Sequence, residues 1–462
     1  MTSRSWALAL LLIVHAAIAC GGESSGGDHT TMDADAAVAA GDPDAGPDLP
    51  AADAAVEPPA TEFDIVVDVE PAGPYGQRSF DVPARSNWVN TGLFLRAGES
   101  ATIAASGTWS YHDEATGPDG ITDIEVVGCP AGMLVARSGL HYEDARACVG
   151  AGAEYTAPRD GILYVGANVS TDLGETYESR VLESDGTIEV TVEGTGDTAP
   201  SIAIGELAGY DLAAVASGWV ELRGAHSVVT VPVADAVRDL GSAAASIRVL
   251  DSIYELHQEI RGAVPAAGQR IRFFPDPDVV PVGYMLAGNP IRCDPSIMSG
   301  GDTQRILRAS EQGTDIWGFA HEVGHDFTMA GGTWVYMYPN LESWPNIFTV
   351  HALRALDRTE DQPNLATYCD GRDAYLAAPS YPTLRSDPFL QLCFLLEFEE
   401  DGGASFWPSF FAALNDLTNE DVQLDTSDPE DRMLWGWIRD RFSEAAGVDV
   451  TPRFQAWSVP LP

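Results

Sequence analysis

The chain has 462 residues and a formal net charge of −44, and all 25 of its basic residues are arginine. So acidic a chain repels nucleic acid, and we expect no nucleic-acid partner. The absence of lysine excludes Schiff-base chemistry and phosphate binding by a P-loop, because both depend on a lysine amine. The length is sufficient for two or three domains with ample core.

The chain begins with an export signal, residues 1–20. Arg4 precedes an apolar run, residues 6–19, that is too short for a stable membrane anchor. Ala17-Ile18-Ala19-Cys20 resembles a bacterial lipobox, which implies that Cys20 carries a lipid at the outer membrane or cell surface. Ordinary cleavage after Ala19, which would give a secreted protein, is the alternative.

Two regions of different composition follow. Residues 21–61 are rich in Gly, Ala, Asp and Pro and lack an apolar period, so we expect a disordered acidic linker. Residues 62–195 contain short alternating apolar runs separated by Gly, Pro and Asp, which predicts a β-sandwich. Cys129 and Cys148 lie in this region, and an oxidising exported setting makes them candidates for a disulfide.

Two segments of the predicted sandwich, 91–111 and 155–168, resemble the calcium-dependent galactose-binding bacterial lectin fold. In that fold, a tyrosine after the first segment and an Asn/Asp-rich loop after the second hold calcium and sugar. The resemblance implies these roles for Tyr111, Asn168 and Asp172, although the consecutive Asn-Asp and Asn-Asn pairs of the fold are missing here. A plain structural sandwich is the alternative.

The pattern H-E-x-x-H occurs at His321, Glu322 and His325. Apolar residues recur around it at helical spacing, with Thr314 as a candidate helix cap. On a helix, two histidines four residues apart lie on one face and can bind one zinc ion. Zinc acidifies a water molecule, and a carboxylate in the place of Glu322 can take its proton.

A zinc site needs a third protein ligand. Glu342 is the candidate, because it opens another apolar, helical segment, and Asp326 is a weaker alternative. Pro345 fits only the first turn of a helix, so Glu342 should lie where that helix starts. His351 is expected in the core or beside the site rather than as a fourth ligand, because a catalytic zinc keeps one position open.

Residues 196–462 resemble the enhancin-like, mucin-directed zinc metallopeptidases, which are metallopeptidase family sixty and of the gluzincin type. The blocks that carry the resemblance follow the family's order: 201–205, 218–224, 228–232, 282–291, Trp317-Gly318 before H-E-x-x-H, Glu342 followed by Asn346-Ile347-Phe348, and 454–461. The resemblance implies that His321, His325 and Glu342 bind zinc, that Glu322 is the general base, and that the substrates are O-glycosylated proteins.

One block departs from the family's pattern. The family usually has Met-His-x-Gly-Tyr-Pro where this chain has Met285-Leu286-Ala-Gly-Asn289-Pro290. If this strand borders the substrate cleft, the preferred glycan differs. The sequence leaves the group that stabilises the oxyanion open, with three unranked candidates: Tyr284, Tyr336 and Tyr338.

The last hundred residues are aromatic and helical in pattern, which is more typical of a core than of a platform for sugars. Of the three remaining cysteines, Cys293, Cys369 and Cys393, we favour a bridge between Cys369 and Cys393 because both lie in this helical region.

We therefore expect a multidomain chain with an N-terminal β-sandwich, then an α+β zincin-type peptidase domain whose C-terminal part is mainly helical. The expected activity is that of a monomeric, lipid-anchored zinc endopeptidase acting on mucin-type O-glycoproteins, with calcium as a further metal in the sandwich. Two alternatives stay open. A general extracellular zinc protease is favoured by Leu286 and Asn289, and a glycan-binding adhesin with a vestigial zinc site is favoured by the lectin-like sandwich.

Overall fold

The computed structural model describes residues 65–71, 73–86, 88–112, 114–142, 145–169, 184–265, 268–300, 305–358, 362–417, 422, 428 and 430–462. Three of the expectations, the export signal with Cys20, the linker 21–61 and the role of Asp172, concern residues that lie outside the described ones. None of the described helices combines the length and the apolar character that a membrane crossing requires.

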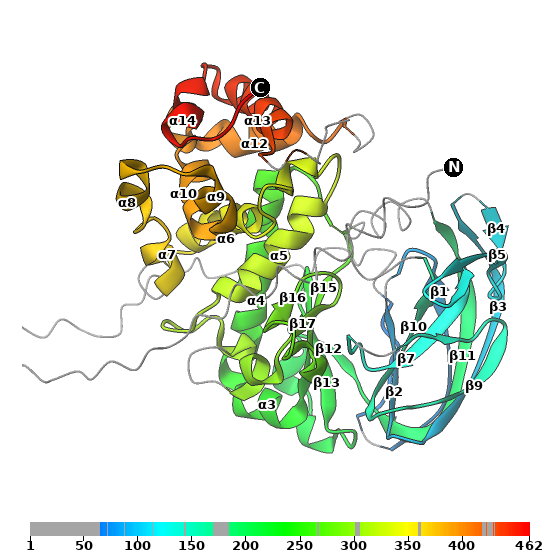
Figure 1. Ribbon diagram of the computed structural model, residues 1–462. Coiled ribbons are helices and arrows are strands. Elements are labelled where there is room, and N and C mark those ends of the chain that lie inside the picture. The colour runs from blue at the N-terminus through cyan, green and yellow to red at the C-terminus, as the bar shows by residue number, and fades with distance from the viewer. Residues whose placement is uncertain are drawn as a thin grey trace, which may run out of the picture.

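The N-terminal part is one curled antiparallel sheet of nine strands (Figure 1). Its strands are β1 (Pro74–Pro83), β2 (Val89–Leu95), β3 (Ser100–Tyr111), β4 (Glu114–Thr116), β7 (Leu134–Ser138), β8 (Ala147–Cys148), β9 (Gly152–Thr156), β10 (Gly161–Ala167) and β11 (Asp185–Thr198). A separate hairpin pairs β5 (Ile121–Val126) with β6 (Cys129–Ala131). The predicted β-sandwich is therefore met only in part, because the main strands form a single hydrogen-bonded sheet.

Strand β11 closes the curl. It pairs with both β1 and β3 over most of its length and reaches β2 at its end. Its inward residues Ile188, Val190 and Val192 recur at the strand period of two and are fully buried in the core that the sheet encloses. Cys129 and Cys148, the expected pair, form a disulfide in this part.

The second part begins with a mixed sheet of six strands in the order β12-β13-β14-β15-β17-β16. The strands are β12 (Ser201–Ala203), β13 (Trp219–Arg223), β14 (Ser227–Pro232), β15 (Ile271–Pro275), β16 (Met285–Leu286) and β17 (Ile291–Cys293). Strand β16 is at one edge and runs antiparallel to β17. The chain passes from the first sheet to the second between Thr198 and Ser201, close to the expected boundary at 195.

The two faces of the six-stranded sheet differ because side chains alternate along each strand. Leu222 and Phe273 point to one side and join the main apolar core. Their neighbours Glu221 and Arg272 form an ion pair on the other side, where the Tyr164 hydroxyl of the curled sheet donates to Glu221 at 2.8 Å. The polar face of the second sheet thus docks on the curled sheet.

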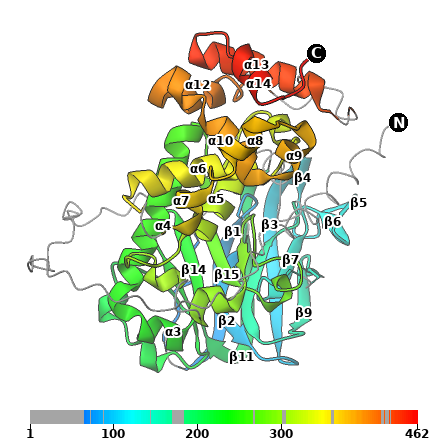
Figure 2. The ribbon, with the colours of Figure 1, turned by 60° about the vertical axis from the view of Figure 1, so that its left-hand side comes forward.

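Helices α3, α4 and α5 contact the strands of this sheet. The described helices of the second part are α3 (Val233–Arg238), α4 (Leu240–Arg261), α5 (Trp317–Met329), α6 (Ser343–Ala355), α7 (Pro363–Thr367), α8 (Arg372–Ala377), α9 (Tyr381–Ser386), α10 (Pro388–Leu396), α11 (Glu399–Gly402), α12 (Phe406–Ala412), α13 (Arg432–Ala446) and α14 (Thr451–Ala456). Helix α4 packs against β14, and α5 and α6 pack against α4 (Figures 1 and 2). Most of the sheet's apolar face is thereby removed from water.

The C-terminal helices lie at one end of the molecule (Figure 1). Their aromatic residues are core, as the sequence pattern predicts: Trp407, Phe410 and Phe442 are almost fully buried. Cys369 and Cys393 form a second disulfide, whereas Cys293 is a buried free thiol. The mainly helical C-terminal part is present.

Candidate active site

Helix α5 carries the H-E-x-x-H pattern and starts at Trp317. The Asp315 side chain accepts a hydrogen bond from the backbone N–H of Trp317 at 2.9 Å. The expected cap, Thr314, lies too far before the helix, and its carbonyl instead accepts from Arg358 and Gln362. The expectation that Thr314 caps this helix is therefore wrong.

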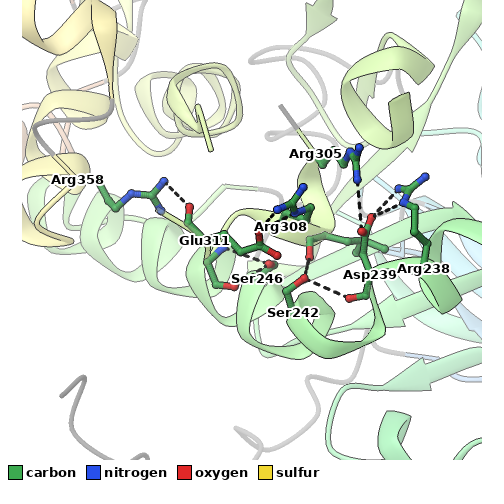
Figure 3. A network of polar contacts seen from close by, with 10 residues as sticks. Arg238, Asp239, Ser242, Ser246, Arg305, Arg308, Glu311 and Arg358 are labelled. Atoms are coloured by element: carbon green, nitrogen blue, oxygen red, sulfur yellow. Dashed lines mark hydrogen bonds and ion pairs between the residues drawn. The ribbon is translucent and has the colours of Figure 1, made fainter. Parts of the chain in front are cut away.

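The segment before α5 is held against α4 by a polar network (Figure 3). The Ser242 hydroxyl donates to the carbonyl of Leu307 at 2.8 Å, and the hydroxyls of Ser246 and Ser310 lie 3.1 Å apart. Arg358 donates to the carbonyl of Ala309 at 2.7 Å. These bonds fix the start of the histidine-bearing helix relative to the long helix beneath it.

A glycine inside the pattern lets α5 and α6 approach closely. A Cβ at Gly324 would lie 2.7 Å from the carbonyl oxygen of Pro345 and 3.2 Å from its Cα. Glycine in a helix costs about 1 kcal/mol relative to alanine. At Gly324 the missing side chain permits a backbone contact that brings the start of α6 to the histidines, and this contact offsets the cost.

Three side-chain atoms meet between the two helices. His321 Nε2 lies 3.1 Å from Glu342 Oε2 and 3.1 Å from His325 Nε2, and the third side of the triangle, His325 Nε2 to Glu342 Oε2, is 3.5 Å. Donor atoms about 2.0–2.1 Å from a tetrahedral zinc ion lie about 3.3 Å from one another. The donor set and its spacing therefore fit zinc. Glu342 directly precedes α6, where Pro345 places it.

Glu322 lies beside this triangle and is buried. Its carboxylate accepts a backbone hydrogen bond from Ala287, the residue after edge strand β16. Burial raises the pKa of Glu322 above its usual range, and the charge of Glu342 adds to this effect, whereas His321 and His325 oppose it. A carboxylate whose pKa is raised is a better proton acceptor than an ordinary glutamate, as a general base requires.

The side chains of His321, His325 and Glu342 shift one another's pKa values through their charges and hydrogen bonds. Burial acts to raise the pKa of Glu342, but the His325 charge and hydrogen bonds from His321 and His325 hold that pKa far below its usual range. Burial acts to lower the pKa of His321, but Glu342 and Glu322 outweigh it and raise this pKa to about 9. At neutral pH, His321 thus carries a proton that a metal ion must displace.

We expect the zinc affinity to rise about tenfold per pH unit between pH 7 and pH 9, because histidine binds zinc only in its neutral form and His321 has a pKa of about 9. Competition with a chelator of known affinity across this range would measure the slope. Calorimetry in two buffers of different ionisation enthalpy should show the release of about one proton at pH 7. An affinity independent of pH in this interval would contradict the expectation.

The sequence pattern includes Asn346 only as part of the block that follows Glu342 and assigns it no role at the site. Asn346 Oδ1 lies 2.7 Å from His321 Nδ1, and Asn346 Nδ2 donates to the carbonyl of Glu342 at 2.7 Å. One amide therefore joins two ligands, and it leaves the His321 Nε2 atom for the metal. The sequence could have indicated this role, because Asn346 lies four residues after Glu342 and therefore on the same face of a helix.

His257 of α4 is a second supporting residue, and no pattern in the sequence points to it. It is fully buried, and burial lowers its pKa to about 3, so the ring is neutral. Its Nε2 lies 3.0 Å from the carbonyl oxygen of Ala320, to which it donates. The bond anchors α5 one residue before His321.

Replacing Asn346 by leucine is expected to weaken zinc binding by about 10–100-fold, because His321 loses the acceptor that orients its ring. Chelator competition would measure the dissociation constant. Asn346→Asp keeps an oxygen at the Oδ1 position and should retain most of the affinity. Equal zinc affinity in Asn346→Leu and the unchanged protein would show that the ring is oriented by other contacts.

The family described as Peptidase M60, enhancin and enhancin-like, matches residues 211–458, which is more than half of the chain. This chain belongs to that family. A curated relative, the TRPM8 channel-associated factor homolog of Xenopus laevis, is 23% identical over 391 residues, which cover 82% of this chain and 39% of the relative. The matched part of this chain thus spans well under half the length of that relative.

Solved structures share the fold. The catalytic module of the metalloprotease ZmpA from Clostridium perfringens matches with a TM-score of 0.55 at 15% identity, covering 83% of this chain and 77% of the module. The M60 catalytic domain of ZmpC from the same organism, in complex with the sialyl T antigen, matches with a TM-score of 0.52 at 16% identity, covering 81% and 73%. At these identities the likeness shows the fold alone.

The other residues considered for the M60 site fall outside the ligand triangle. Asp326 is buried but does not belong to the three-atom group. His351 Nε2 lies 2.7 Å from Glu399 Oε1. The fully buried Tyr336 hydroxyl donates to the carbonyl of Thr328 at 2.7 Å, which removes it as an oxyanion group. Tyr284 and Tyr338, both half-buried, stay as candidates.

The residues proposed for calcium and sugar in the curled sheet have structural surroundings. Tyr111 is buried in the core of that sheet. Asn168 is fully buried: its Nδ2 donates to the carbonyls of Val126, Cys129 and Pro130, and its Oδ1 accepts from Arg146 at 3.0 Å. The Asn168 oxygen that would bind calcium therefore accepts from an arginine instead. The surroundings of Tyr111 and Asn168 do not support a calcium site.

Proposed function

We propose that this M60 chain is a zinc endopeptidase that cleaves mucin-type O-glycoproteins. The observation that carries the proposal is the triangle of His321, His325 and Glu342, with Glu322 beside it. When bound there, zinc would polarise the scissile carbonyl and acidify the attacking water. His321, His325 and Glu342 would hold the metal and leave one position open.

The chain's own residues would supply the proton transfers. Glu322 would accept the proton of the attacking water and pass it to the leaving amine. Its hydrogen bond with the backbone of Ala287 orients the carboxylate. The edge strand β16 is antiparallel to its neighbour β17, and an extended substrate could pair along its outer edge, as in a zincin-type layout.

The proposal includes a preference for substrates that carry O-linked glycans. The ZmpC structure of the same fold was solved in complex with the sialyl T antigen, which supports an O-glycan substrate class for a related chain. Of the two departures in the β16 block, Asn289 has a structural role: it donates to the carbonyl of Arg270 and accepts from the N–H of Arg272. Leu286 is then the substitution that bears on glycan choice.

A general protease without glycan dependence is the second candidate, and Leu286 is the observation that favours it. Leu286 occupies the strand next to Ala287, where the family usually has a polar histidine. An apolar side chain there would offer no hydrogen bond to a sugar.

We also propose that the protein lies at the cell surface and is anchored there through a lipid on Cys20. This proposal rests on the sequence alone.

A matched peptide pair, identical except for one O-linked GalNAc, tests the function. Mass spectrometry would follow cleavage by the zinc-loaded protein, with Glu322→Ala as the control. Cleavage of only the glycosylated member, lost in the variant, is expected. Equal cleavage of both members would support the general protease, and glycan binding without cleavage would support the adhesin.

A further inference from the structure

The segments that carry the proposed zinc site contain carboxylates but neither arginine nor lysine. These segments are the edge-strand block 282–291, helix α5 and the connection 330–342. Apart from the two histidines of the H-E-x-x-H pattern, their charged residues are Glu322, Asp326 and Glu342. Glu322 and Glu342 together would balance the two charges of a zinc ion. The segments therefore present no surplus of positive charge to a substrate.

Arginines on the neighbouring elements are engaged elsewhere. Arg354 of α6 lies 3.5 Å from a carboxylate oxygen of Glu399. Arg385 of α9 lies 2.6 Å from a carboxylate oxygen of Asp431. Arg292 of β17, the strand beside β16, is only 3% exposed and donates to a backbone carbonyl at 2.8 Å. Because arginine and lysine are the side chains that bind carboxylate and sulfate groups, an acidic sugar at the site would gain no such partner from these elements.

The charge of the whole chain acts in the same direction. The chain has 69 acidic and 25 basic residues, which gives the formal net charge of −44. Burial raises the pKa of the Cys293 thiol, in the strand beside β16, and the charges of nearby carboxylates, Glu322 first among them, raise it further. Charges of one sign around a cleft repel a substrate of that sign, and salt screens this repulsion. A negatively charged glycan should therefore bind less readily than an uncharged one.

We propose that this site selects O-glycopeptides whose glycan is uncharged, and that it discriminates against glycans that carry sialic acid or sulfate. The inference rests on the proposed function, because it concerns the substrate of the same site. Half-buried Leu286 of β16 agrees with it, because this position, where the family usually has a histidine, offers no group that could carry a positive charge. Discrimination by charge should weaken in salt, whereas discrimination by size should not.

Three glycopeptides of one sequence test the inference. The first carries one O-linked GalNAc, the second carries sialic acid on that GalNAc, and the third carries the methyl amide of the same sialic acid, which is similar in size but uncharged. Mass spectrometry would measure kcat/KM of the zinc-loaded full chain at ionic strengths of about 20 and about 500 mM. At the lower ionic strength we expect similar values for the first and third peptides and a value about tenfold lower for the second. At the higher ionic strength this difference should fall below about threefold.

A cation added near the site should reduce the discrimination. Met329 is half-buried and lies four residues after His325, so the two side chains are neighbours on the surface of α5. Met329→Arg is expected to raise kcat/KM for the sialylated peptide, relative to the GalNAc peptide, about threefold at low ionic strength. Val448→Arg is the matched control, because it adds the same charge at an exposed position beyond the end of α13. There the ratio should change less than about twofold.

The outcomes separate this inference from the proposed function. Equal cleavage of the sialylated peptide and its amide at low ionic strength would overturn the inference and leave the proposed function intact. Slow cleavage of both would also overturn it, because the size of the sialic acid would then be the cause. If protein with one bound zinc ion per chain cleaved none of the three peptides, the proposed function would fail and the inference with it.

Discussion

Replacing Glu322 by glutamine is expected to lower kcat for peptide hydrolysis by about 10²–10⁴-fold while zinc stays bound. Glutamine keeps the shape of the side chain and an oxygen that can accept from Ala287, but it cannot take a proton. Zinc should remain because the ligand atoms belong to His321, His325 and Glu342. Steady-state kinetics on an O-glycopeptide would measure kcat, and atomic absorption on the same preparation would measure the zinc content per chain.

Asp326→Asn is the matched control for this prediction. Asp326 lies on the same helix, is also buried, and is outside the ligand triangle. We expect this variant to bind one zinc ion per chain and to keep kcat within about threefold, an effect far below that of losing the general base. Loss of zinc in Asp326→Asn, together with retention in Glu342→Gln, would show that the ligand set is wrong. More than a tenth of the original kcat in Glu322→Gln would show that another group is the base.

The sequence identifies the local part of the site and misses the long-range part. His321 and His325 can be paired from sequence because their spacing on one helix determines their common face. Glu342 was a candidate because it opens an apolar, helical segment, and the family resemblance implied the same role for it; the fixed backbone of Pro345 placed it at the start of α6. His257 comes from another helix, distant in sequence, and no local pattern connects it to Ala320.

For the strands, too, the sequence predicts the local structure but not the long-range pairing. Alternating apolar residues predict that β11 is a strand with one buried face, as Ile188 and Val190 demonstrate. Its pairing with both β1 and β3 depends on residues about a hundred positions away, so the sequence did not distinguish one curled sheet from a two-sheet sandwich. The ion pair between Arg272 of β15 and Glu221 of β13 likewise joins residues that are distant in the sequence, and no local pattern predicts it.

Gly324→Ala is expected to lower the free energy of unfolding by about 1–3 kcal/mol, although alanine is the better helix former. The added Cβ would lie 2.7 Å from the Pro345 carbonyl oxygen, which belongs to a backbone and cannot rotate away. Helix α6 must then move outward, and Glu342 and Asn346 move with it. Zinc affinity should therefore fall about tenfold or more together with stability.

Gly241→Ala separates this effect from helix propensity. Gly241 lies in the first turn of α4, and nothing stands within 4 Å of a Cβ added there. The same substitution should stabilise the protein by about 0.4–1 kcal/mol and leave zinc binding unchanged. Urea unfolding of the metal-free proteins, followed by chelator competition, would compare the two variants. If both glycines gave a gain in stability, the contact between α5 and α6 would be loose, and the glycine within the H-E-x-x-H pattern would have no role in bringing Glu342 to the histidines.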